Sequence, residues 1–170
     1  MDSINEVIRQ SAAKGDVSTK YLTFQIDGQH YGISIAHVIE IVQLQPLTEL
    51  PELPYYVKGV INLRGRVVPL IDMSLRFGKP EREYTDRTCV IIVDIDREHV
   101  GLIVDTVEDV LDIDESLIAP PPAFSVDASA RYVTGIGKLD RYMVLLLDSR
   151  LIFSDADIGI FHSPPCETTI

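Results

Sequence analysis

Alternation of apolar and polar residues runs through the first part of the chain and predicts strands rather than helices. The run YLTFQIDGQHYGISI, residues 21–35, alternates on both sides of Asp27-Gly28, a pair typical of the turn of a β-hairpin. The run HVIEIVQL continues this period of two and places Val38 and Glu40 on the same face of a third strand. The next ten residues carry three prolines, which favour a loop.

The remainder of the chain predicts more strands and almost no long helix. The further apolar runs are GVINLRGRVVPLID (59–72), TCVIIVDI (88–95), HVGLIVD (99–105), TVEDVLDI (106–113), RYVTGIGKL (131–139) and RYMVLLLD (141–148). Between them, DMSLRFG predicts a single helical turn and APPPAF predicts a proline-rich loop. About ten strands joined by turns are typical of β-barrels and β-sandwiches.

Two stretches of the chain resemble each other, which predicts two similar units. YVKGVINLRGRVVPLID from Tyr56 aligns without gaps with YVTGIGKLDRYMVLLLD from Tyr132, and YGISIAHVIEI aligns with VGLIVDTVEDV, each ahead of its copy. A repeat of two copies indicates a pair of five-stranded units rather than a solenoid. The expected organisation is a flexible segment at 1–19, a first barrel at 20–82, a second barrel at 83–153 and a C-terminal helical turn and tail at 154–170, with one terminal strand able to cross between barrels.

The first repeat has a polar turn between two apolar runs. Asn62 and Gly65 fit the first and fourth positions of a type I turn, which predicts a three-residue hairpin loop with a bulge and a left-handed glycine. Leu63 and Arg64 are then expected at an exposed apex. The second copy has Lys-Leu-Asp-Arg in this region and lacks both the Asn and the Gly. The two units are therefore expected to share a scaffold but not this tip.

Two strands are apolar at successive positions and need cover on both faces. They are CVIIV, from Cys89, and VLLL, from Val144. An antiparallel strand with one wet face should alternate, so continuous apolar runs indicate burial on both sides. One cover is the strand's own barrel. The other is either the sister barrel or a different protein, and the sequence leaves both open, since small barrels often need additional burial.

Composition and charge limit the classes of partner and site that this chain is expected to have. Apolar residues make up 46% of the 170-residue chain, and the formal net charge is −11. Such an acidic balance argues against nucleic acids and anionic membranes as main partners. There is no apolar run of membrane-spanning length and no signal-peptide core, so we expect a cytoplasmic protein without direct membrane insertion. Two distant cysteines indicate neither a disulfide scaffold nor a metal site.

Motifs of enzymes and metal sites are incomplete in this sequence. There is no G-x-S-x-G, and the histidines have no H-E-x-x-H spacing. The stretch from Asp94 to Asp105 has acidic residues at several places of a calcium loop, but His99 stands where the loop needs a glycine. Alternation through this stretch favours a hairpin with an acidic turn instead. We therefore expect no catalytic residues, no metal and no cofactor.

Taken together, these blocks resemble the family of bacterial chemotaxis coupling proteins, CheW, from about Tyr21 to about Phe161. The blocks YGISI..VIEI, GVINLRG..VPLID, GLIVDTVEDVL and YVTGIGKL follow the family's order, and GVINLRG..VPLID is the most specific of them. The resemblance implies an all-β fold of two packed five-stranded SH3-like β-barrels, with short helical turns and a short C-terminal helix. It also implies a non-enzymatic adaptor that couples methyl-accepting chemoreceptors to the histidine kinase CheA, in the cytoplasm and recruited to membrane chemoreceptor arrays.

The resemblance also implies roles for individual residues. The positions expected to contact the cytoplasmic tip of the receptor are Val38, Glu40, Lys58, Gly59 and Arg64. The positions expected to face the regulatory domain of the kinase are Cys89, Val107 and Phe124, with Phe124 in a contact that closes rings of kinase and adaptor copies. Asn62 and Gly65 are expected to shape the turn that presents Arg64.

Two alternatives remain open at this point. The first is a small-ligand or enzymatic β-barrel that uses Arg64, Lys58 and Glu40 as a polar pocket. The second keeps the adaptor but assigns it to a chemosensory pathway other than the flagellar one. The first alternative requires a deep pocket around Arg64, whereas an adaptor requires an open groove there.

Overall fold

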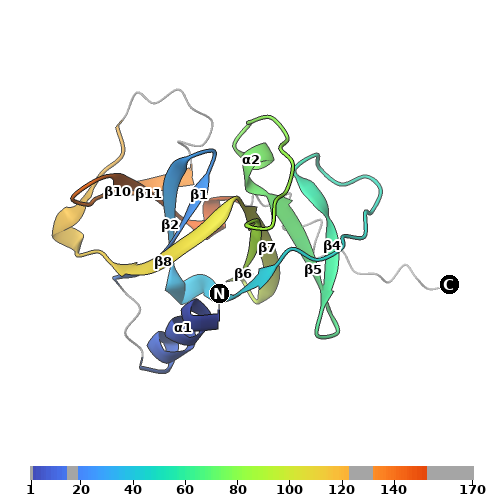
Figure 1. The fold of residues 1–170 in the computed structure, drawn as a ribbon, viewed down its shortest axis with the longest axis horizontal. Coiled ribbons are helices and arrows are strands. Elements are labelled where there is room, and N and C mark those ends of the chain that lie inside the picture. The colour runs from blue at the N-terminus through green and yellow to red at the C-terminus, as the bar shows by residue number, and fades with distance from the viewer. Residues whose placement is uncertain (1, 15–18, 123–131, 153–170) are drawn as a thin grey trace.

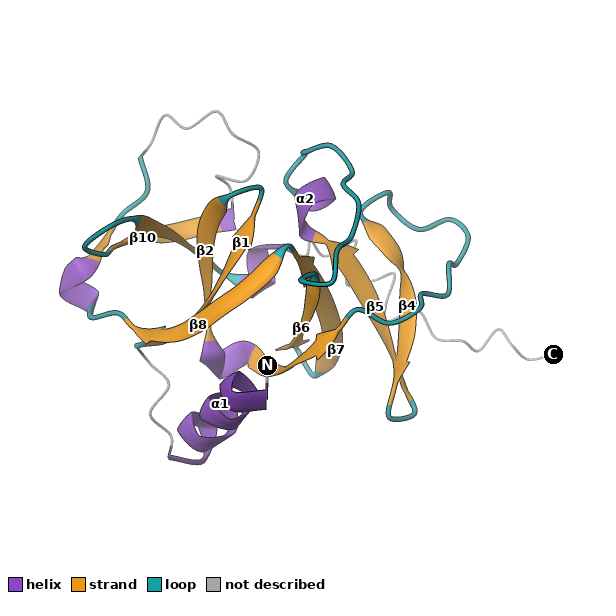
Figure 2. Ribbon diagram, viewed as in Figure 1, coloured by secondary structure: helices purple, strands orange, loops and turns teal. Residues whose placement is uncertain are grey.

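The structure, a computed structural model, describes residues 2–14, 19–122 and 132–152. Strands dominate this part of the chain, with short helices between them (Figure 2). In chain order the elements are α1 (Asp2–Lys14), β1 (Lys20–Ile26), β2 (Gln29–Ser34), η1 (Ile35–His37), β3 (Val38–Gln43), β4 (Val57–Leu63), β5 (Arg66–Asp72), α2 (Met73–Arg76), β6 (Cys89–Ile95), β7 (Glu98–Val104), β8 (Thr106–Asp112), η2 (Glu115–Leu117), β9 (Ile118–Ala119), β10 (Val133–Lys138), β11 (Met143–Leu147) and α3 (Ser149–Ile152).

The strands form two curled sheets that lie side by side (Figure 1). Barrel A has the strand order β8-β1-β2-β11-β10-β9, and barrel B has the order β3-β6-β7-β5-β4. This arrangement confirms the predicted all-β fold of two packed SH3-like barrels, with the two-residue strand β9 as an addition to barrel A. The short helix α3 ends at Ile152, and the predicted tail at 154–170 lies outside the described residues.

The predicted boundary between residues 82 and 83 requires each half of the chain to form one barrel. In the structure, the barrels do not coincide with the two halves. Barrel A combines β1 and β2 with β8 to β11, whereas barrel B combines β3 to β5 with β6 and β7. Each half of the chain therefore contributes one hairpin, β1–β2 or β6–β7, to the barrel whose remaining strands come from the other half. The cause is local: a single residue, Asp105, separates β7 from β8, and a tight hairpin needs about two loop residues. Strand β8 consequently runs on into the other sheet, and β3 does the same after η1.

The internal repeat corresponds to equivalent strands in the two barrels. Hairpins β1–β2 and β6–β7 are each antiparallel, and each then pairs in parallel with the last strand of a second hairpin, β11 or β5. Hairpins β4–β5 and β10–β11 both shift register just before a glycine, Gly59 in one and Gly135 in the other. The aspartates that end both repeats cap the helices that follow: Leu75 N–H donates to Asp72 at 3.2 Å, and Arg150 N–H donates to Asp148 at 2.9 Å.

The largest hydrophobic core lies between the barrels. In the run CVIIV, Ile91 and Val93 join this shared core, whereas Val90 and Ile92 point into the interior of barrel B. The run VLLL divides in the same way, with Leu147 in the shared core and Val144 in the interior of barrel A. The second cover that these strands required is therefore the sister barrel within the same chain.

The N-terminal segment, which was expected to be flexible, contains the helix α1. This helix lies beneath the junction of the barrels (Figure 1), against β3, β8 and η1. Ile4 and Ile8 are one helical turn apart and therefore share a face, and Ile8 is only 2% exposed. No helix in the described ranges has the length and apolar character needed to span a membrane.

The turn between β4 and β5 is tighter than predicted. Leu63 pairs with Arg66, so the loop consists of Arg64 and Gly65 alone, and both have left-handed backbones, with φ of 54° and 85°. Two left-handed residues make a turn of the mirror-image type I′, whose twist matches that of the flanking strands better than a type I turn does. Asn62 retains a local role, because its Oδ1 accepts a hydrogen bond from Gly65 N–H at 2.8 Å.

Gly59 and Gly65 allow two costs of adding a Cβ to be measured separately. Gly65→Ala meets no atom within 4 Å, so it should destabilise the fold only through the left-handed backbone, by about 1 kcal/mol. Gly59→Ala combines a φ of 148° with a Cβ only 2.5 Å from the Thr48 carbonyl oxygen, and should cost clearly more, roughly 2–4 kcal/mol. Urea unfolding of both variants checks the order; equal losses would contradict the clash at Gly59.

Candidate functional site

The candidate site lies at the open seam of barrel B, whose two outermost strands are β3 and β4. Glu40 projects from β3, and Arg64 reaches toward it from the tip of the β4–β5 hairpin. The guanidinium binds the carboxylate with both of its terminal nitrogens, and the Arg64 Nη2 to Glu40 Oε1 distance is 2.7 Å. A two-point contact of this kind fixes the plane of the guanidinium as well as its position.

Exposure differs sharply between the two partners of this ion pair. The Glu40 side chain is 18% exposed, whereas that of Arg64 is 68% exposed. Hydrogen bonding from Arg64 lowers the pKa of the Glu40 carboxyl more than its burial raises that pKa, and the charges of Arg64, Arg9 and His99 add to the lowering. Glu40 is thus held ionised as a support, and the guanidinium of Arg64 has further N–H donors beyond the two that Glu40 binds.

The pair borders a groove of about 760 Å³ on the surface of the molecule. Its walls come from α1, from β3 with the start of the following loop, and from the β4–β5 tip; the lining residues are Asn5, Arg9, Glu40, Ile41, Val42, Gln43, Leu44, Gln45, Pro46 and Arg64. Val42, Leu44 and Pro46 add apolar side chains to a lining that is mostly polar. The ligand-pocket alternative needs Arg64 in an enclosed cavity, but its side chain is mostly exposed on the rim of this open groove.

The free edges of β3 and β4 are each covered at one residue. At β3, the Asn5 side-chain amide both donates to the Ile41 carbonyl at 3.0 Å and accepts from the Ile41 N–H at 2.8 Å. At β4, Thr48 exchanges two backbone hydrogen bonds of 2.9 Å with Val60. These contacts satisfy part of the edge backbone that a barrel seam otherwise leaves open.

The other predicted receptor contacts do not join this groove. Val38 is buried at the start of β3 as part of the shared core. Gly59 lies on β4, where its missing side chain makes room for the backbone of Thr48. Lys58 forms an ion pair with Glu81 and lines a separate hollow of about 330 Å³ under the loop that precedes β4. Of the predicted set, the structure brings only Glu40 and Arg64 into direct contact.

The predicted kinase contacts have different environments. Cys89 is 8% exposed and belongs to the shared core, so its thiol does not form part of an exposed surface; it starts β6, whose apolar run is covered on both faces. Burial raises the pKa of this thiol, and a hydrogen bond with the Val107 backbone opposes that shift. Val107 itself is half-buried on β8 in barrel A. Phe124 lies outside the described residues.

Sequence reasoning missed the contribution of α1 to this site. Asn5 and Arg9 both line the groove, yet they fall in the segment predicted to be flexible. The spacing of Ile4 and Ile8 was the available signal, since apolar residues four apart indicate a helix with one buried face. A helix of about 13 residues is marginal by itself, and only its packing on β3 and β8 makes the signal decisive.

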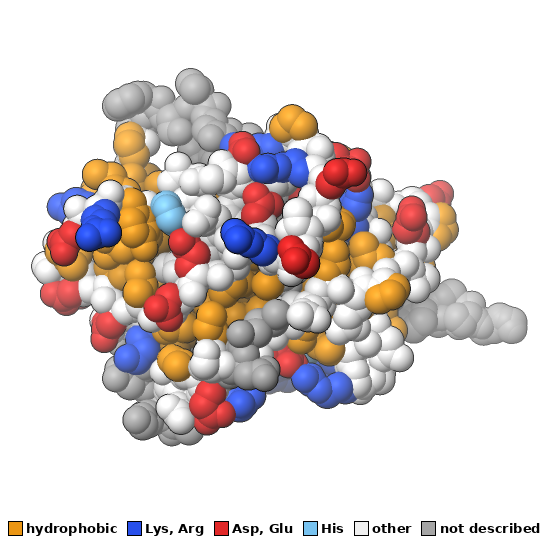
Figure 3. Space-filling view, in the orientation of Figure 1, with side chains coloured by type: hydrophobic (Ala, Val, Ile, Leu, Met, Phe, Trp, Pro, Cys, Tyr) orange, Lys and Arg blue, Asp and Glu red, His pale blue; other side chains and the backbone are white. Residues whose placement is uncertain are grey.

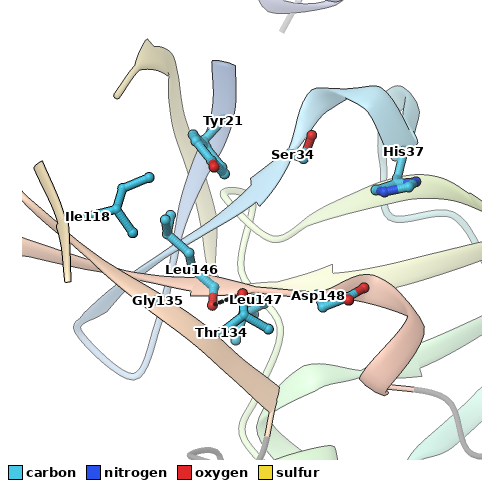
Figure 4. A pocket seen from close by; sticks show the side chains of 9 residues that line it. All are labelled: Tyr21, Ser34, His37, Ile118, Thr134, Gly135, Leu146, Leu147 and Asp148. Atoms are coloured by element: carbon cyan, nitrogen blue, oxygen red, sulfur yellow. Dashed lines mark hydrogen bonds between the residues drawn. The ribbon is translucent and has the colours of Figure 1, made fainter. Parts of the chain in front are cut away.

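A second hollow, of about 290 Å³, opens in barrel A (Figure 4). Apolar side chains such as Tyr21, Ile118 and Leu146 line one part, and the polar side chains of Ser34, His37 and Asp148 are spread along its rim rather than pointing at one another. Within the described ranges, no group of three or more His, Cys, Asp or Glu side chains is placed to hold a metal ion.

Charged side chains of both signs are scattered over the face shown in Figure 3, between apolar patches. One group of ion pairs joins the β1–β2 turn to the segment that precedes β6. Arg82 Nη1 lies 2.7 Å from Asp27 Oδ1 and 3.4 Å from Asp105 Oδ2, and Lys79 lies 3.8 Å from Asp27. Because Asp27 lies in the β1–β2 turn of barrel A, whereas Lys79 and Arg82 lie between β5 and β6 of barrel B, the pairs add a polar link across the junction of the barrels.

Known proteins of similar sequence and structure indicate the family of this chain. The family model for the CheW-like domain matches residues 20–157. The chain is 35% identical to the chemotaxis protein CheW of Klebsiella aerogenes, covering 85% of this chain and 87% of that protein. It is also 35% identical to the probable chemotaxis protein CheW of Rhizobium etli, with 87% and 94% covered.

Among solved structures, the crystal structure of the scaffolding protein TtCheW from Thermoanaerobacter tengcongensis superposes with a TM-score of 0.75 at 36% identity. That match covers 82% of this chain and 94% of the other. The family model spans the strands of both barrels, from β1 to β11, and the chain therefore belongs to the CheW family of chemotaxis proteins.

Proposed function

We propose that this protein is a non-enzymatic adaptor that couples methyl-accepting chemoreceptors to the histidine kinase CheA. The observation that carries the proposal is the Glu40–Arg64 pair, in which a largely covered carboxylate holds an exposed guanidinium at the rim of an open groove. Membership of a chemotaxis family supplies the context. An open groove lined by both polar and apolar side chains suits an extended partner surface better than a small substrate.

The receptor tip is the proposed occupant of the groove. Chemoreceptor tips are helical, and an amphipathic helix can place apolar side chains against Val42, Leu44 and Pro46 and polar side chains against the rest of the lining. Arg64 would then receive a carboxylate of that helix with the N–H groups that Glu40 leaves free. An exposed ion pair adds little to folding stability, so its supporting role in docking explains the arrangement better than fold stability does.

The kinase is proposed to bind a different surface, on barrel A. Val107 lies on β8, the strand at one end of that sheet, whereas Arg64 belongs to barrel B. Val107 is half-buried, so a partner can reach part of its side chain. Separate surfaces on two barrels that share one rigid core would let both partners bind at the same time, which is what coupling requires.

Arg64→Asp should weaken receptor binding by roughly tenfold or more, because it replaces a forked donor with a repelling charge at a docking contact. The melting temperature should stay the same, since the side chain is exposed. Binding to the isolated kinase regulatory domain should persist. Titrations of the folded variant against a coiled-coil fragment of the receptor tip and against the kinase domain measure both effects.

The matched control for this variant is Arg141→Asp. Arg141 is an exposed arginine in the β10–β11 turn, the counterpart of the Arg64 turn in the other barrel. It carries the same change of charge away from the groove and should leave receptor binding within about twofold of the parent protein. If both variants lose receptor affinity equally, the effect is one of net charge, and Arg64 is not a docking contact.

Val107→Glu should weaken binding to the kinase regulatory domain and spare binding to the receptor tip. The residue packs partly on the shared core, so circular dichroism and a melting curve must first show that the variant folds. Val107→Thr, which keeps the shape and replaces one methyl group with a hydroxyl, serves as the milder variant. Normal kinase affinity in a folded Val107→Glu protein would remove β8 from the proposed surface.

A further inference from the structure

We propose that helix α1 is a fixed wall of the docking groove and that Arg9 on this helix contacts an acidic side chain of the partner. The partner is thus an amphipathic helix with carboxylates along its flanks. This inference rests on the proposed function and adds the chemistry by which the groove selects its partner.

Helix α1 is attached to β3 at the groove itself. Asn5 binds both backbone groups of Ile41, at 2.8 Å and 3.0 Å, as a neighbouring strand would. One turn farther along, Ile8 is buried in the shared core at 2% exposure. Displacing the helix would break both hydrogen bonds and expose Ile8, so a partner that binds beside Glu40 meets α1 in place.

Arg9 lies at the groove with most of its side chain exposed. It follows Asn5 by four residues, which sets both side chains on the same side of the helix, and both line the groove. The charge of Arg9 contributes to lowering the pKa of the Glu40 carboxyl, so it acts at the Glu40–Arg64 pair. Its ion pair with Glu6, at 2.8 Å, is exposed and leaves the Arg9 side chain 65% exposed.

The charges that line the groove favour an acidic partner. Arg9, Arg64 and Glu40 are its charged lining residues. The two arginines are about two-thirds exposed and Glu40 is mostly covered, while Glu6, which pairs with Arg9 and is 54% exposed, is not among the lining residues. A partner in the groove therefore meets guanidinium groups from both α1 and the β4–β5 tip. On a chain with a net charge of −11, the two exposed guanidinium groups give a carboxylate of the partner charged donors that the rest of the acidic chain mostly lacks.

The test is Arg9→Glu in the full-length protein, titrated against the same coiled-coil fragment of the receptor tip. Affinity should fall about fivefold at about 50 mM salt, and the loss should shrink at about 500 mM salt, as expected for a contact between exposed charges. Arg150→Glu is the control: Arg150 lies on the short helix α3, is 64% exposed and also pairs with an acidic residue of its own segment. It should leave receptor affinity unchanged.

The outcomes separate this inference from the proposed function. If Arg64→Asp loses receptor binding but Arg9→Glu does not, α1 is no part of the docking surface and the inference fails alone. If removal of residues 1–18 strengthens receptor binding, α1 obstructs the groove, which also overturns it. If neither arginine matters for receptor binding, the proposed function falls as well. Loss of receptor affinity in Arg9→Glu, with kinase affinity kept and Arg150→Glu unchanged, supports the inference.

Discussion

The shared core between the barrels is the constraint on which the rest of the structure depends. The interior of barrel A has a small buried cluster of its own, Ile113, Val144 and Leu146, and the larger cluster is formed jointly by both barrels. Because the chain passes from one barrel to the other at β3 and again at β8, each barrel contains strands from both halves of the chain, and this core cannot form from either half alone. The two barrels are therefore expected to fold and unfold as one unit.

The crossing of β3 also determines where the docking groove lies. Val38 and Ile41 anchor the strand in the shared core, which fixes the backbone from which Glu40 projects. Strand β3 remains outermost in barrel B, so one of its edges faces outward, and α1 and the β4–β5 tip can flank it. The orientation of Arg64 is thus set by Glu40, which is in turn positioned by the contact of the two barrels.

Strand periodicity, the repeat and the doubly apolar runs predicted most of the fold, because each records which faces of a strand are buried. The exchange of strands was missed, since a repeat in sequence specifies which segments are equivalent but not which of them pair. The turn at Arg64 was read as type I because Asn62 and Gly65 suit that turn, whereas strand twist selects the tighter form. Glu40 and Arg64 are 24 residues apart, and family resemblance rather than periodicity identified them.

Rigidity and exposure are divided between different residues at this groove, and that division suits an adaptor. The residues that hold the groove in shape, Ile8 and Ile41 among them, are buried and contribute to stability. The residues proposed to meet a partner, Arg9 and Arg64, are exposed and contribute little to it. Partner-contacting positions of this kind can change with little cost to the fold, so members of one family can keep the two barrels and differ in the partners they select.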